Sequence, residues 1–134
     1  MKTTSLAFAL IAVVVTPTFA DDITLACKGK FEARGQGDPM VEEVTGSVVV
    51  GSNWVSISFV PDRCTITASR PNGIDFKCPL PPLGAGWHWE RTGYLDRYNG
   101  DFELSTTKAP PNEPGKFGST ETYVLTCKPA TRMF

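Results

Sequence analysis

Residues 64–78 read CTITASRPNGIDFKC, and this segment by itself has the pattern of a β-hairpin. On each side of the central RPNG, apolar residues alternate with polar ones, as in a strand with one buried face. Proline second and glycine last in RPNG are typical of a type I turn, with Gly73 expected in the left-handed conformation. We therefore predict a hairpin that carries Cys64 and Cys78 on its core side.

A similar alternation extends outward from this hairpin to both ends of the chain. The segments that show it are 23–34, 41–50, 55–59, 86–97, 102–104 and 121–128. Glycine, proline and asparagine separate them, and Asn99-Gly100 is a strong hairpin signal. We predict an all-β fold, a single antiparallel domain of about eight strands, with a small up-and-down barrel as first choice and a two-sheet β-sandwich as the alternative.

The composition suits one small folded domain. The chain has 134 residues, of which 41% are hydrophobic and 10% aromatic, enough to build one core. Its 13 basic and 14 acidic side chains leave a net charge of −1. Such a balance argues against nucleic acid or an anionic lipid surface as a partner. We expect a monomer that binds no nucleic acid.

The first twenty residues have the layout of a secretory signal peptide. Lys2 precedes an apolar run over 6–15, and Thr18-Phe19-Ala20 places small residues before the expected cut between Ala20 and Asp21. The apolar run is too short to span a bilayer as a permanent anchor. We predict residues 1–20 as a leader, 21–134 as the single β-domain, and the periplasm or the medium as its destination.

All four cysteines follow the leader, and an even number in an exported chain is typical of disulfides. A zinc site is disfavoured because the chain has no Cys-x-x-Cys pair and only one histidine, His88. The alternation turns Cys27 and Cys127 inward on the first and last strands, which are antiparallel and can be neighbours in an eight-stranded meander. We predict the pairs Cys27–Cys127 and Cys64–Cys78.

Three stretches carry a resemblance to known proteins. They are DDITLACKG at 21–29, LDRYNG at 95–100 and YVLTCKPATRMF at 123–134. Together they resemble a group of small exported proteins of Gram-negative bacteria that have no assigned function. The resemblance supports export and the pairing of Cys27 with Cys127. It implies no catalytic residue.

The sequence offers no convincing catalytic constellation. His88, the only base suited to a nucleophilic triad, lies in GWHWE at 86–90, and no Gly-x-Ser-x-Gly motif is present. On a strand, His88 and Glu90 would project to one face and the two tryptophans to the other. The carboxylates are best explained by solubility, and no calcium-loop pattern occurs. We expect no enzyme activity, no catalytic residue, no cofactor and no metal.

Aromatic residues form the one candidate binding surface. Trp87, Trp89, Tyr94 and Tyr98 fall close together in the sequence, and Phe117 lies in the proline-rich loop that precedes the last strand. Exposed, these side chains could stack on a sugar or anchor a protein partner. Buried, they would fill the core, and this second interpretation is favoured.

These features lead to a hypothesis of function by binding. We expect an exported, non-enzymatic β-domain that binds a protein or a component of the cell envelope. One alternative is a periplasmic inhibitor of a cell-wall-active enzyme such as lysozyme, by analogy of fold alone. Another is a carrier of a small ligand, because an eight-stranded barrel can hold one ligand at its mouth.

Overall fold

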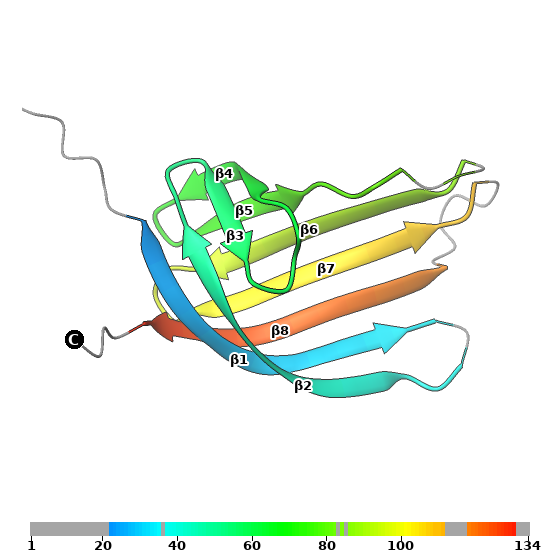
Figure 1. Cartoon of the computed structure of the whole chain (residues 1–134), viewed down its shortest axis with the longest axis horizontal. Helices are drawn as coiled ribbons and strands as arrows, with labels where there is room; N and C mark the ends of the chain where they lie inside the picture. Colours follow the sequence, from blue (N-terminus) through cyan, green and yellow to red (C-terminus); the bar gives the residue numbers. More distant parts are fainter. Residues whose placement is uncertain (1–21, 36, 83, 85, 112–117, 131–134) are drawn as a thin grey trace, which may run out of the picture.

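The computed structural model describes residues 22–35, 37–82, 84, 86–111 and 118–130. The predicted leader, residues 1–20, lies outside them. The described chain forms eight strands in a closed antiparallel barrel in which each strand pairs with the next and β8 pairs with β1 (Figure 1). The strands are β1 (Ile23–Arg34), β2 (Met40–Val50), β3 (Trp54–Ile57), β4 (Cys64–Arg70), β5 (Gly73–Cys78), β6 (His88–Asp96), β7 (Asp101–Ala109) and β8 (Ser119–Pro129). The up-and-down barrel is confirmed, and the sandwich is not what the chain forms.

Both predicted disulfides are present. Cys27 on β1 lies directly opposite Cys127 on β8, with 4.0 Å between the two Cα atoms, so this bond fastens the two strands that close the barrel. Cys64 and Cys78 are bonded across the β4–β5 hairpin, with a Cα–Cα distance of 4.1 Å. Because β1 and β8 pair along most of their lengths, closure leaves neither of them as an open edge.

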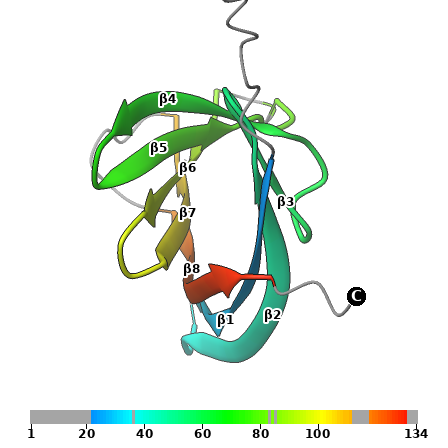
Figure 2. The same ribbon diagram turned by 90° about the vertical axis from the view of Figure 1, so that its left-hand side faces the viewer.

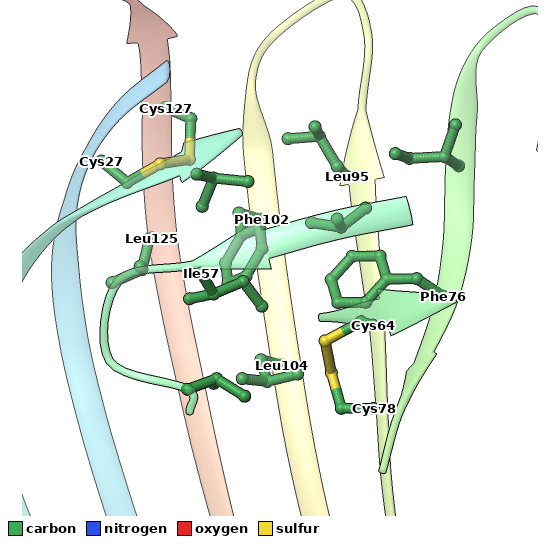
Figure 3. Packing of buried hydrophobic residues seen from close by; sticks show 14 residues of the cluster. Cys27, Ile57, Cys64, Phe76, Cys78, Leu95, Phe102, Leu104, Leu125 and Cys127 are labelled. Carbon is green, nitrogen blue, oxygen red and sulfur yellow. A yellow bond between two sulfur atoms is a disulfide. The ribbon is translucent and has the colours of Figure 1, made fainter. Parts of the chain in front are cut away.

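The core consists of inward-facing residues from all eight strands. Phe76 and Phe102 are its largest fully buried side chains, and their ring centroids are 5.8 Å apart. In Figure 3 these two rings and Ile57 lie between the two disulfides, whose sulfurs belong to the same buried cluster. The buried set also includes Val48, Val55, Val60, Ile74, Leu95, Leu104 and Leu125.

Two turns show different uses of glycine. Gly100, which precedes β7, has φ +76°, and its backbone carbonyl accepts a hydrogen bond from the Cys127 amide. Gly73 was predicted in a left-handed conformation, and this is wrong, because the described glycines with positive φ are Gly37, Gly86 and Gly100. Gly73 is already the first residue of β5, and a Cβ there would lie 2.5 Å from the Tyr94 hydroxyl. Glycine is therefore needed at this position because a side chain would collide with Tyr94, and a left-handed backbone conformation is not the reason.

The strands differ in length, and the difference shapes one end of the barrel. β3 has 4 residues and ends at Ile57, two residues earlier than the alternation suggested. It pairs with β2 only over 48–50, and β5 pairs with β6 only from Arg91 to Asp96. The other five strands, β1, β2, β6, β7 and β8, extend beyond β3–β5 at the right of Figure 1. We call this projecting part the overhang.

The described residues include no helix that is long and apolar enough to cross a membrane. They also include no group of three or more histidine, cysteine or acidic side chains placed to hold a metal ion.

Candidate functional site

Polar side chains occupy the inner face of the overhang. Arg91 on β6 pairs with Thr106 on β7, which in turn pairs with Glu121 on β8. The three alternate in step with the buried leucines of their own strands, so they face the same way as the core. Thr106 is 6% exposed, and its hydroxyl accepts a hydrogen bond from Arg91 Nε at 2.8 Å. Arg91, Thr106 and Glu121 thus form a polar row that extends the inward-facing positions of the core into the overhang.

An aromatic stack lies beside the polar row. The ring of Tyr123 is 4.6 Å from that of Phe31 and 4.5 Å from that of Phe59, measured between centroids. Burial raises the pKa of the Tyr123 phenol, and the negative charges of Glu121 and Glu42 raise it further. The positive charge of Arg91 acts the other way. The phenol therefore stays protonated at neutral pH and can serve as a hydrogen-bond donor on this face.

Trp87 and Trp89 are half-buried on the same inner face as Arg91. The indole Nε1 of Trp89 donates a 2.7 Å hydrogen bond to the carbonyl oxygen of Pro81, in the segment that follows β5. The ammonium group of Lys108 lies 5.1 Å from the ring centroid of Trp87. Both indoles are thus held in place while part of each remains accessible.

The expectation that tryptophan would fill the barrel is wrong. All three tryptophans are half-buried, and the buried hydrophobic cluster contains phenylalanine, aliphatic residues and the disulfides instead. Trp54 lies at the start of β3, beneath the guanidinium group of Arg63, which is 4.0 Å from its ring centroid. Trp54 alternates with the buried Val55 and Ile57 and therefore faces outward, whereas Trp87 and Trp89 lie on the overhang, so the closed part of the barrel holds none of the three indoles.

The two tyrosines of the predicted aromatic surface lie away from the tryptophans. Tyr94 faces outward from β6, against Gly73 and 5.8 Å below the guanidinium group of Arg70. Tyr98 is 81% exposed in the turn between β6 and β7. Phe117, the fifth predicted residue, lies outside the described residues. The aromatic residues that are close in the sequence therefore do not form one surface. Trp87 and Trp89 lie on the inner face, Tyr94 on the outer face and Tyr98 in a turn.

His88 and Glu90 are exposed on the outer side of β6, as the alternation indicated. Glu90 forms an ion pair with Lys77 at 3.2 Å. Glu90 borders a hollow of about 490 Å³ on the outer surface of the sheet, where Asp75 is likewise paired with Arg70 at 2.8 Å. These paired, solvated charges have the character of an ordinary protein surface. A second hollow of about 370 Å³ lies at the edge of β6 that β5 does not cover, and His88 and Glu90 line it together with the inner-face residues Trp87, Trp89 and Arg91.

A cavity of about 480 Å³ opens at the end of the barrel opposite the overhang, and we call it the turn-end pocket. Figure 2 faces this end, where the β4–β5 and β6–β7 turns, the start of β1 and the end of β8 surround the opening of the barrel. Five aliphatic side chains line the pocket, namely Ile23, Leu25, Val50, Ile74 and Leu95.

The small-ligand alternative placed a ligand at the mouth of the barrel, but none of the residues that line the turn-end pocket was predicted for it. A signal was present, because Ile23 and Leu25 continue the inward alternation past Cys27 and Val50 does so on β2. What could not be read from the pattern is that Ile23 remains 56% exposed while facing Val50 across the β1–β2 pair.

The barrel thus presents two candidate sites, a polar and aromatic face on the overhang and an apolar pocket at the turn end. Comparisons of the chain with protein-family models, with curated proteins and with solved structures found no match.

Proposed function

We propose that this protein is an exported, non-enzymatic binding domain that recognises a protein partner in the cell envelope through the inner face of the overhang. The observation that carries the proposal is the placement of two partly accessible tryptophans, Trp87 and Trp89, beside Arg91 on a hydrogen-bonded sheet. Tryptophan, tyrosine and arginine are the residue types that dominate the binding energy of protein interfaces.

The side chains of this face are ordered before any partner arrives. Trp89 is held by the carbonyl oxygen of Pro81, and Arg91 by the hydroxyl of Thr106. The barrel that carries them is held by two disulfides, one between β1 and β8 and one between β4 and β5. A face that is already ordered loses little conformational entropy on binding, which favours affinity.

The charges of the face are separated by strand. Arg91 and Lys108 lie on β6 and β7, whereas Glu42 and Glu121 lie on β2 and β8. A partner with acidic groups facing β6 and β7 and basic groups facing β2 and β8 would be oriented by this polarity. A partner with the reverse arrangement would place like charges together and would bind more weakly. Such a pattern suits a folded protein surface better than a uniformly charged polymer.

Export is part of the same proposal. Two disulfides form and persist in oxidising compartments such as the periplasm or the extracellular medium. The leader-like residues 1–20 support the same destination.

The test compares two faces of one strand. The oxidised protein, immobilised, is exposed to envelope extract beside a Trp89→Ala/Arg91→Ala variant and a Thr92→Ala/Tyr94→Ala variant. The second variant removes two side chains from the outer side of the same strand that do not line the hollow shared by Trp89 and Arg91, and it serves as the matched control. We expect one or more proteins to be retained by the wild type and the control and to be lost from the inner-face variant.

Circular dichroism and thermal unfolding verify that both variants remain folded. If the inner-face variant retains the same proteins as the control, the overhang is not the recognition surface. A lysozyme inhibition assay on the same three proteins examines one specific partner class: inhibition that depends on Trp89 and Arg91 would identify it.

A further inference from the structure

We propose that the turn-end pocket is a second binding site, which takes a single amphiphile with an apolar tail and an anionic head group. The site is separate from the overhang, at the opposite end of the strands, and does not depend on the function proposed above. Three properties of the pocket support this ligand: its volume, the chemistry of its walls and the charges at its mouth.

The volume and the walls select an apolar guest of modest size. Cavities that hold small molecules in proteins usually measure about 300–1,000 Å³ and are lined mainly by hydrophobic side chains. The turn-end pocket measures about 480 Å³. Its floor is formed by Ile74 and Leu95, which are only 2% and 6% exposed, and its side by the more accessible Ile23. An aliphatic chain would bury this exposed surface.

The mouth of the pocket has an excess of positive charge. Three charged residues line it, Asp96, Arg97 and Lys128. The Asp96 carboxylate is turned into the β6–β7 turn, where it accepts hydrogen bonds from the amides of Tyr98 and Asn99 at 2.8 and 3.0 Å. One oxygen of that carboxylate, Oδ1, is therefore engaged by the backbone of the turn.

Arg97 is the group that we assign to the ligand head. Its backbone amide donates to the carbonyl oxygen of Asn72 at 2.9 Å, and one guanidinium nitrogen donates to the hydroxyl of Ser69 at 2.7 Å. The first bond ties the backbone of Arg97 to the β4–β5 turn, and the second holds its guanidinium group against β4. The remaining guanidinium donors form no ion pair with a described acidic residue. A planar, pre-positioned guanidinium group suits a carboxylate or a phosphate.

Isothermal titration calorimetry of the oxidised protein tests the proposal, with dodecanoate, dodecanol and dodecyltrimethylammonium as probes below their micelle-forming concentrations. We expect dodecanoate to bind with one-to-one stoichiometry. We expect dodecanol to bind at least tenfold more weakly and the cationic probe more weakly still. Equal affinity for all three probes, or no heat of binding with any of them, would overturn the proposal.

Variants separate the two parts of the site. Leu25→Trp adds bulk to the wall and should abolish binding of both dodecanoate and dodecanol. Arg97→Gln should reduce the affinity for dodecanoate at least tenfold and leave that for dodecanol unchanged, and Arg97→Lys should recover part of the loss. Arg63→Gln removes the same charge from a position over Trp54 and is the matched control. If Arg63→Gln weakens dodecanoate as much as Arg97→Gln does, the head-group assignment is wrong.

Sedimentation measurements distinguish an amphiphile from a second copy of the chain. Ile23 and Tyr98 are exposed at this end and would also suit a dimer contact. We expect a monomer with and without dodecanoate. A dimer that Ile23→Asp disperses would mean that another copy covers the pocket, and the proposal would fail.

Discussion

The two ends of this barrel are built from the same strands, yet their inner faces differ in chemistry. On β7, Phe102 and Leu104 are buried hydrophobic residues, and the next two inward positions are Thr106 and Lys108. On β8, the inward Leu125 is followed toward the overhang by Tyr123 and then by the exposed Glu121. The change occurs where β3, β4 and β5 end.

The difference teaches that an inward position is a core position only where the sheet closes around it. Beyond β3–β5, water reaches the inner face, so charged side chains there keep much of their hydration and incur only a small burial cost. At the turn end the walls are aliphatic and the charge is confined to the rim. Stability therefore resides in the closed middle of the barrel, and the surfaces suited to recognition lie at its two ends.

The largest effect should come from the disulfide that closes the barrel. The bond between Cys27 and Cys127 spans 100 residues, against 14 for Cys64 and Cys78. In the chain-entropy model the double alanine variants should lose about 4–5 and about 3 kcal/mol of unfolding free energy, respectively. Urea unfolding measures both. A larger loss from the Cys64 and Cys78 variant would show that local packing, rather than loop closure, governs this fold.

Truncating a middle residue should cost far more than truncating an overhang residue. Phe76 is 1% exposed, and Phe76→Ala should destabilise the protein by about 3–5 kcal/mol. Trp89 is the larger side chain, but it is half-buried, and Trp89→Ala should cost about 1 kcal/mol. Thermal and urea unfolding of the two variants compare them directly. Equal losses would mean that the overhang is part of the cooperative core.

The polar row should contribute much less than the buried Phe76. Thr106→Val keeps the shape of the side chain but removes the acceptor for Arg91 Nε. Because Arg91 is only partly buried and water can replace the threonine, the expected loss is about 1 kcal/mol. Thr106→Ser retains the hydroxyl and is the control. Unfolding of both variants in urea decides the matter, and a Ser variant as unstable as the Val variant would assign the effect to packing.

The smallest effect is a dependence on pH at the aromatic stack. The pKa of Tyr123 is raised above its ordinary value of 10.0 in the folded protein, mainly by burial. The stability linked to this group is fully present below about pH 10 and is lost as the pH rises through the folded pKa, since the unfolded chain ionises first. Tyr123→Phe should show a shallower loss of stability between pH 8 and pH 11. Identical slopes would place the phenol in free contact with water.

Much of the fold could be predicted because the decisive signals are local. The alternation around 64–78 and at the chain ends determines which way each cysteine points, and two inward cysteines on neighbouring antiparallel strands can bond. The residues around 64–78 and at the two chain ends were therefore sufficient to predict the barrel and both disulfides. The same rule placed His88 and Glu90 on the outer side of β6.

The candidate sites were only partly predictable. The aromatic residues were grouped because they are close along the chain. On a strand, however, neighbouring residues point to opposite faces, so Tyr94 lies on the face opposite Trp89. Tyr98 lies in the following turn, away from both. The sequence pattern also assigned Gly73 to turn geometry, whereas the glycine is needed by Tyr94 on the adjacent strand. Contacts between strands depend on register, which no single segment contains.

By itself, the sequence determined the strands, their faces and the two covalent pairs, because a period of two and a pair of inward sulfurs act over a few residues. Only the tertiary structure decided how far β3–β5 reach along the barrel. Because these strands end early, Leu104 is buried while Trp89, which also faces inward, is only half-buried. At the opposite end, the inward-facing Ile23 lines the turn-end pocket. Burial depends on what stands opposite a side chain, and in a barrel that neighbour comes from a distant part of the chain.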